Sequence, residues 1–306
     1  MADLIYNDED LILSYSQINS YKDCQAKWVI ERVFRKKYQG NISTAKGTLI
    51  HAIAEQLTKP GKVNIYEVLD DVAKKDRNIR PFYSDLRKWI PVAQNLLITL
   101  IDKGLLVKER DGFVSESKYA SKRKKTKSSF VVTINGAIDG FGLFTNKIVI
   151  RDYKFKARKN FLLSEDEIAR DLQLRMYVKF VCDNMPPDLE RPNIARLSHI
   201  YLIEETGEVF EVAAEVDVDE VLKEVTEFVD GASERIAKTY ASAVAEVRTK
   251  LRNRHINVSD TKKLSKEELV HAENLLPSMN LEGNLNHCEA YRGCPHKAYC
   301  PVYAKR

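Results

Sequence analysis

The chain has 306 residues, 44% of them hydrophobic, which is enough to bury a core in one large α/β domain or in a domain with a helical extension. Lys and Arg together number 49 against 44 Asp and Glu, so the net charge of +5 gives only weak support for a nucleic-acid partner. The sequence contains neither a secretion signal nor an apolar run of roughly 18 residues. These features exclude a peptide-sized binder, and we expect a soluble intracellular protein.

The first hundred residues follow a helical pattern. Apolar residues at helical spacing predict three helical stretches, over 14–38, 44–57 and 66–104. Pro81 and Pro91 are expected to interrupt the third stretch. His51 and Glu55 lie four residues apart in the second, so they are neighbours on one helix surface.

The middle of the chain changes to a strand-like pattern. Short runs predict an antiparallel meander, with strands over 107–119, 129–136, 140–144 and 147–154. An amphipathic helix follows over 165–184, where Ser164 and Glu167 form a capping-box pattern. A hairpin around Thr206-Gly207 and a long helix over 217–250 complete the expected elements.

A carboxylate and an ammonium group stand close together on one predicted strand. Asp152 and Lys154 lie two residues apart after the apolar run 148–150, so both project from the same face. If the strand before pairs with this one, Asp139 can approach from its own end. Two carboxylates suit a Mg²⁺ ion, and a nearby lysine can orient water and stabilise charge during phosphodiester hydrolysis. An Asp-x-Lys pattern alone also describes an exposed strand of alternating charge.

Two predicted helices add further polar groups. His51 offers an imidazole, which can bind Mn²⁺ or another transition metal beside carboxylates, although a lone histidine is more often structural. Gln173 and Tyr177 lie four residues apart on one helix face, where they could contact a phosphate or a base.

Three of the five cysteines are crowded near the C-terminus. Cys288, Cys294 and Cys300 are spaced six residues apart, and thiolates at short intervals select zinc or an iron–sulfur cluster. Either site requires a fourth ligand. Zinc stays an alternative because His287 or His296 could replace a thiol, but the spacing is wide for a zinc site. Cys182, on the apolar face of a helix, is expected to be a buried thiol.

The segment 118–127 is strongly basic. Its cations are Lys118, Lys122, Arg123, Lys124, Lys125 and Lys127. A basic hairpin tip would suit the phosphate backbone of DNA, and a solvated loop is the alternative.

Five segments in order carry a resemblance: SYSQINSYKDC, GTLIHAIAE, GAIDGF, RDYKFK and QLRMY. They resemble the RecB-like exonuclease family of the PD-(D/E)XK nuclease superfamily, in its iron–sulfur cluster-containing branch, which includes CRISPR-associated and phage exonucleases. The resemblance implies an α/β fold with a restriction-endonuclease-like core, in which helices flank a mixed central sheet. We expect a single nuclease domain over 1–306, with a helical insertion at 60–105 and a cysteine-rich tail at 284–306 that is joined to Cys24.

The resemblance also implies roles for individual residues. His51, Asp139 and Asp152 would bind the metal ion, and Lys154 would act with the two aspartates in catalysis. Glu116 is our candidate for a further catalytic acid; Glu109 and Glu55 compete for that place. Gln173 and Tyr177 would contact DNA, together with the basic residues Lys122, Arg123, Lys124 and Lys125. A 4Fe-4S cluster would be bound by Cys24, Cys288, Cys294 and Cys300.

We therefore expect an Mg²⁺- or Mn²⁺-dependent DNA exonuclease in the cytoplasm of a bacterial, archaeal or phage-infected cell. Its substrate would be single-stranded DNA or duplex ends, in recombination, repair, phage replication or CRISPR adaptation, with recombination or CRISPR proteins as partners. One alternative is a catalytically inactive DNA-binding or scaffold protein with a structural iron–sulfur or zinc site. Another is a zinc-stabilised protein that acts on something other than nucleic acid.

Overall fold

The computed structural model describes residues 10–36, 40–108, 111–121, 124–284, 294–297 and 300–304. The chain forms two compact units. Unit 1 consists of 1–38, 120–135 and 227–306, and unit 2 of 39–119 and 136–226. Within the described ranges, no helix combines the length and apolar character that crossing a membrane requires. The single nuclease domain over 1–306 stays a prediction, because two compact units can belong to one domain.

A mixed sheet forms the centre of unit 2. Its strands are β2 (Phe113–Ala120), the later part of β4 (Val131–Phe144), β5 (Lys147–Lys156), β6 (Ile194–Ile203) and β7 (Val209–Asp217). β5 pairs antiparallel with β4 and parallel with β6, and β6 pairs antiparallel with β7. β2 also pairs with β4. This mixed sheet, with helices beside it, fits the restriction-endonuclease-like architecture that the sequence predicts.

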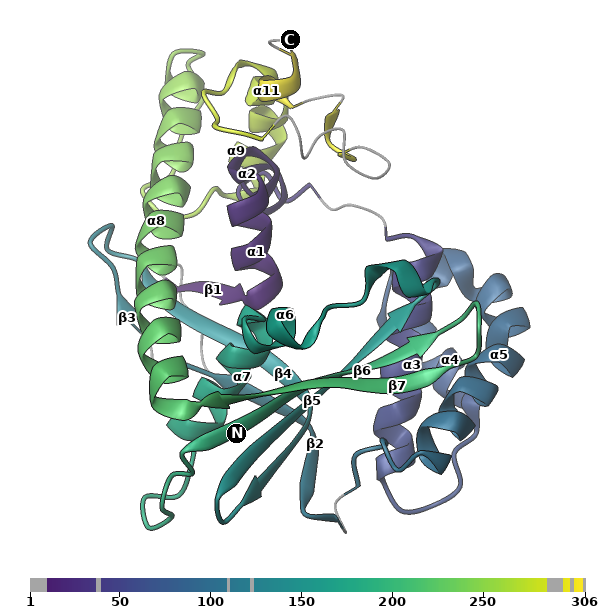
Figure 1. Ribbon diagram of the computed structural model, residues 1–306. Coiled ribbons are helices and arrows are strands. Elements are labelled where there is room, and N and C mark those ends of the chain that lie inside the picture. Colours follow the sequence, from purple (N-terminus) through teal and green to yellow (C-terminus); the bar gives the residue numbers. More distant parts are fainter. Residues whose placement is uncertain are drawn as a thin grey trace. The chain divides into compact units, whose positions relative to one another are not determined.

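Helices cover both faces of this sheet (Figure 1). One face carries α3 (Ile42–Thr58), α4 (Ile65–Lys75), η1 (Arg80–Phe82) and α5 (Tyr83–Asp102). Their apolar side chains form a core with Tyr153 and Ile200 of the sheet. On the other face lie α6 (Glu165–Ala169) and α7 (Leu172–Asp183), after the short η3 (Lys159–Phe161). The predicted insertion, 60–105, contains α4 and α5, and its status as an insertion stays a prediction.

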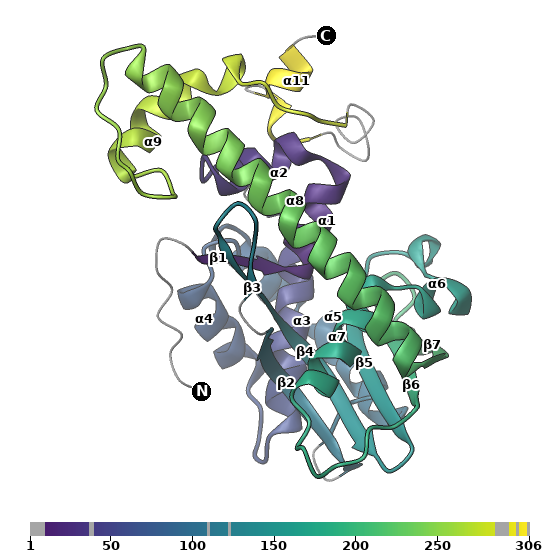
Figure 2. The ribbon, with the colours of Figure 1, turned by 90° about the vertical axis from the view of Figure 1, so that its left-hand side faces the viewer.

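Unit 1 is built along the long helix α8 (Val218–Arg252), from Glu227 onward (Figure 2). β1 (Asp10–Ser14) pairs parallel with 131–135 of β4, and β3 (Lys124–Lys125) pairs antiparallel with the same part. The remaining elements are α1 (Tyr15–Asp23), α2 (Gln25–Arg32), α9 (Lys266–Ala272), η4 (Glu273–Ser278) and α11 (Pro301–Ala304).

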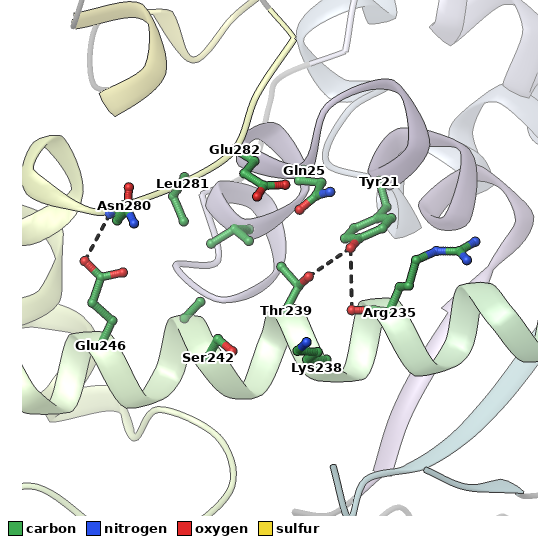
Figure 3. A pocket seen from close by; sticks show the side chains of 12 residues that line it. Tyr21, Gln25, Arg235, Lys238, Thr239, Ser242, Glu246, Asn280, Leu281 and Glu282 are labelled. Atoms are coloured by element: carbon green, nitrogen blue, oxygen red, sulfur yellow. Dashed lines mark hydrogen bonds between the residues drawn. The ribbon is translucent and has the colours of Figure 1, made fainter. Parts of the chain in front are cut away.

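Aromatic packing holds α1 and α2 against α8. The Trp28 ring is fully buried, and its centroid lies 5.6 Å from that of Tyr21 and 6.2 Å from that of Tyr240. The Tyr21 hydroxyl lies 2.8 Å from Thr239 Oγ1 of α8 (Figure 3). The Ala26 amide donates to the carbonyl of Glu282, so the segment before the cysteine tail also packs on this helix pair.

The structure corrects several predicted boundaries. The helix over 14–38 breaks at Cys24, whose extended backbone separates α1 from α2. The strands over 129–136 and 140–144 are one strand, β4. Pro91 does not interrupt α5, because the buried side chains on either side of it keep the helix packed against the core. The helix over 165–184 ends at Ala169 and restarts with Asp171 as the N-cap of α7.

Other predictions are confirmed. Ser164 and Glu167 form the capping box at the start of α6. β6 and β7 form the hairpin around Thr206-Gly207, and α8 is the predicted long helix.

A buried ion pair in unit 1 anchors the chain between α8 and α9. Arg248 Nε donates to Glu268 Oε1 at 2.8 Å, and Glu268 is only 2% exposed. The Arg248 guanidinium also donates to the Lys263 carbonyl and to Ser259 Oγ. Burial acts to raise the pKa of Glu268, but the hydrogen bonds from Arg248, Ser265 and Ser259 outweigh it and lower the pKa to about 2.

Glu268 should therefore make the free energy of unfolding depend on pH in the acidic range. Because its folded-state pKa is lowered, its contribution is fully present above its usual pKa of 4.5 and is lost as the pH falls toward about 2. We expect Glu268→Gln to lower the free energy of unfolding at neutral pH by roughly 3 kcal/mol, because Arg248 stays buried without its carboxylate. Urea denaturation at a series of pH values measures both effects. Glu267→Gln, at an exposed neighbouring position, is the control; equal acid sensitivity of Glu268→Gln and the wild type would contradict this role.

Candidate active site

Asp139 and Asp152 meet where β4 and β5 separate in unit 2. The antiparallel pairing of these strands ends at Gly140 and Arg151, so the two aspartates are the next residue on each strand. Asp139 is 9% exposed and Asp152 2%. Asp139 Oδ2 accepts a hydrogen bond of 2.7 Å from the Tyr153 amide, which takes the place of a strand-to-strand bond. The ladder therefore ends in two buried carboxylates.

Helix α3 brings His51 to this place. The helix begins at Asn41, whose side chain accepts a hydrogen bond from the Thr44 amide at 2.9 Å. Two turns into the helix, His51 Nδ1 lies 3.1 Å from Asp139 Oδ1. Glu55, one turn further on, forms an ion pair with Lys59 at 2.8 Å instead of joining the aspartates.

Lys154 and α7 complete the cluster. Lys154 Nζ lies 2.7 Å from Asp152 Oδ2 and donates to Gln173 Oε1 at 3.0 Å. Gln173 Nε2 lies within hydrogen-bond distance of Asp152 Oδ1, at 3.2 Å, and of the Tyr177 hydroxyl, at 2.5 Å. Gln173 thus connects Asp152, Lys154 and Tyr177. The structure brings together His51, Asp139, Asp152, Lys154, Gln173 and Tyr177.

Burial and charge shift the pKa values of this cluster. Burial raises the pKa of Asp139, His51 partly opposes that shift, and the Asp152 charge raises it further. For Lys154, burial acts to lower the pKa, but the charge and hydrogen bond of Asp152 outweigh it, so the pKa is raised. Burial and the nearby aspartates also raise the pKa of Tyr177. Lys154 is therefore held as an ammonium beside Asp152.

Two residues that the sequence motifs do not indicate, His199 and Asp171, also lie near Asp152. In the parallel pairing of β5 and β6, His199 lies opposite Asp152 and is only 2% exposed. His199 Nε2 lies 3.8 Å from Asp152 Oδ2 and 3.9 Å from Asp171 Oδ2, beyond direct hydrogen-bond distance. Asp171 also caps α7, which carries Gln173. The only sequence signal was a histidine inside the apolar run of a predicted strand.

The structure does not place every predicted residue relative to this cluster. Glu116 lies on β2, and its side chain is outside what the structure describes, as are Glu109, Lys122 and Arg123. Lys124 and Lys125 form β3 in unit 1, where Lys124 Nζ lies 2.6 Å from Asp230 Oδ1. That ion pair places the lysine side chain against α8 rather than free in a loop.

Thiols from both ends of the chain lie near one another in unit 1. Cys24, Cys294 and Cys300 are buried, and burial raises the pKa of Cys294. A hydrogen bond from the His296 backbone lowers the pKa of Cys294, whereas the charges of Cys24 and Cys300 raise it. These two thiols therefore lie close enough to Cys294 for their charges to act on it. Cys288 and His287 lie outside the described residues. The His296 side chain contacts Glu31, with Nε2 3.1 Å from Oε1.

Cys182 is only half-buried, and burial raises its pKa to about 11.

The donor set of the aspartate cluster suits a divalent cation. Within the part of the chain that the structure describes, no three His, Cys, Asp or Glu side chains are arranged as a formed metal site. Asp139 and Asp152 are nevertheless buried close enough for their charges to interact. His51 and Lys154 face these carboxylates, and a cation would relieve the same repulsion. Carboxylate oxygens with one imidazole are suitable ligands for Mg²⁺ or Mn²⁺.

Comparison with known proteins identifies the family. The model of the PD-(D/E)XK nuclease superfamily matches residues 12–301. The chain therefore belongs to the PD-(D/E)XK nuclease superfamily, whose members are metal-dependent nucleases. No curated protein matches the sequence.

Among solved structures, 31 chains match, including the crystal structure of SSO0001. That structure is 12% identical, with a TM-score of 0.28, and the match covers 63% of this chain and 87% of the other. A TM-score this low does not define a shared fold, so the family assignment depends on the family model alone.

Two buried carboxylates without a metal ion should reduce stability. Asp139→Asn removes one charge and keeps an oxygen that can accept from the Tyr153 amide. In EDTA we expect this variant to be more stable than the wild type by about 1 kcal/mol, a shift of a few degrees in the unfolding midpoint. Mn²⁺ should raise the midpoint of the wild type but not of the variant.

Differential scanning calorimetry, with and without Mn²⁺, measures both effects. The control is Asp188→Asn, at an exposed position in the same unit, which should behave as the wild type. An equal Mn²⁺ effect on Asp139→Asn and the wild type would show that Asp139 does not bind the ion.

Proposed function

We propose that the protein is an Mg²⁺- or Mn²⁺-dependent DNA exonuclease of the RecB-like type. The observation that carries this proposal is the convergence of His51, Asp139, Asp152 and Lys154 at the end of the β4–β5 ladder. These residues come from a helix and two strands, and the sequence predicted all of them as one site. The family match supports nuclease activity in general.

Each residue then has a distinct role. His51, Asp139 and Asp152 would hold the divalent ion, which supplies Lewis-acid stabilisation and activation of water when it is bound. Lys154, kept protonated by Asp152, places a positive charge where it can stabilise negative charge that develops on the phosphate. Gln173 holds Lys154 and Asp152 in position through hydrogen bonds to both. Its contact with Tyr177 also positions that hydroxyl beside the phosphate site.

The substrate proposed is DNA, as single strands or duplex ends. Gln173 and Tyr177 would contact it beside the aspartates, and the basic segment around Lys124 and Lys125 would bind backbone phosphates. The Lys124–Asp230 ion pair lowers the contribution of that lysine, so Lys125, which is exposed, is the stronger candidate of the two. A function in recombination, repair, phage replication or CRISPR adaptation, with protein partners from those pathways, remains a prediction.

Nuclease activity should depend on Asp152 and Lys154. Asp152→Asn and Lys154→Ala should each reduce the release of nucleotides from end-labelled single-stranded DNA by at least about 100-fold, because each removes a group that acts on the transition state. EDTA should abolish the activity, and Mg²⁺ or Mn²⁺ should restore it. Lys159→Ala is the matched control, since Lys159 lies on the surface and pairs with Glu208.

A closed circular single strand separates exonuclease from endonuclease activity. An exonuclease leaves the circle intact and degrades the same strand once it is linear. Full activity in Asp152→Asn would rule out this site, and inactivity with every divalent ion, together with salt-sensitive DNA binding, would favour a binding or scaffold protein.

We also propose that Cys24, Cys294 and Cys300, with Cys288, bind a 4Fe-4S cluster. Support comes from the burial of the three described thiols, which come from opposite ends of the chain, and from the charges of Cys24 and Cys300 that act on Cys294. Such a cluster would close a very long loop and so stabilise unit 1. Zinc is the alternative ligand for the same thiols.

Absorption spectra test the cluster. The anaerobically purified protein should be brown and absorb broadly near the blue end of the visible range, and Cys24→Ala or Cys300→Ala should lose this absorption. Cys182→Ala should keep it, because that thiol belongs to unit 2, whereas the proposed ligands belong to unit 1. A colourless protein with stoichiometric zinc would overturn the cluster assignment.

A further inference from the structure

An open cavity of about 550 Å³ lies beside the aspartate cluster, within unit 2. Helix α3 forms one wall and the end of β5 the other. The lining residues are Ser43, Thr44, Gly47, Thr48, His51, Tyr153, Lys154 and Phe155. Two of these, His51 and Lys154, also belong to the proposed catalytic cluster, so the cavity is continuous with it. Its volume is in the range of pockets that bind small molecules.

Gly47 is unexpected at its position in α3. It lies inside a helix of 17 residues, where glycine costs about 1 kcal/mol relative to alanine. Packing does not require it: a Cβ added here would meet only Phe155 Cβ, at 4.0 Å, which is ordinary contact. No positive φ angle requires it either. The absence of a side chain instead leaves space in the cavity, one helical turn before His51.

The opposite wall is the part of β5 that lies beyond its pairing with β4. β5 pairs with β6 as far as Lys156, whereas its pairing with β4 ends at Arg151. The cavity therefore follows β5 past the end of its ladder with β4. Phe155 is part of this wall, and its ring makes an edge contact of 5.3 Å with Trp89 of the core. The hydroxyls of Ser43, Thr44 and Thr48 line the α3 side.

We propose that this cavity binds one unpaired deoxynucleotide next to the phosphate that is cleaved, and that Gly47 keeps it open. The inference rests on the proposed nuclease function, because it places the phosphate at the aspartates and Lys154. Phe155 and the hydroxyls of Ser43, Thr44 and Thr48 give the lining both apolar and hydrogen-bonding groups, which suit a nucleobase and its sugar. A base in a duplex would first have to leave its stack and its partner, which costs a few kcal/mol. The site therefore selects single-stranded ends.

Binding of thymidine monophosphate and inorganic phosphate tests this without catalysis. Calcium replaces the active metal ion, and titration calorimetry or competition gives the dissociation constants. The wild type should bind the nucleotide at least about tenfold more tightly than phosphate, because only the nucleotide fills the cavity. Gly47→Leu should remove this preference and leave phosphate binding unchanged. Gly47→Ala should keep most of it and raise the unfolding midpoint, since alanine favours the helix.

Gln56→Leu is the matched control, since it adds the same side chain to α3 outside the cavity lining. In kinetic assays, Gly47→Leu should raise KM for single-stranded DNA at least about tenfold, with a smaller change in kcat. Equal binding of nucleotide and phosphate by the wild type, or a nucleotide preference that survives in Gly47→Leu, would overturn the inference. An inactive wild type that still shows the Gly47-dependent preference would refute the nuclease function and leave the nucleotide site standing.

Discussion

The burial of two carboxylates side by side at the end of the β4–β5 ladder is the constraint on which the rest of unit 2 depends. Asp139 and Asp152 repel each other in a place with little access to water, so each needs compensating partners. α3 supplies His51 to one carboxylate, and β5 itself supplies Lys154 to the other. α3 therefore contributes both apolar side chains to the core and an imidazole to the carboxylates.

Several residues at this place depart from the most stable choice. The Tyr153 amide donates to the side chain of Asp139 rather than to a backbone carbonyl of β4. The pairing of β4 with β5 therefore ends where the carboxylates lie. Gly47 weakens α3 one turn before His51, although packing would accept a larger residue. His199 lies buried near Asp152 and Asp171 at distances too long for direct hydrogen bonds. Such departures from the most stable choice gather at functional sites.

Much of this site could be predicted, because its residues lie at short spacings that local geometry decides. Strand alternation places Asp152 and Lys154 on one face, and helical spacing places Gln173 next to Tyr177. His199 could not be found in this way, since its relation to Asp152 arises from the parallel pairing of β5 with β6. The break at Cys24 was also missed, because the apolar spacing on its two sides continues as if one helix ran through.

The sequence by itself determined which segments become helices and strands, where most caps and turns lie, and which acidic, basic and thiol side chains are available at the candidate sites. These properties depend on side-chain periodicity and on contacts between residues only a few positions apart. Only the tertiary structure decided that β4 is a single strand, that α5 continues through Pro91, that His199 lies near Asp152, and that Gly47 lines a cavity. Contacts between residues far apart in the chain settle those points, and no local pattern encodes the register between strands or the space between a helix and a sheet.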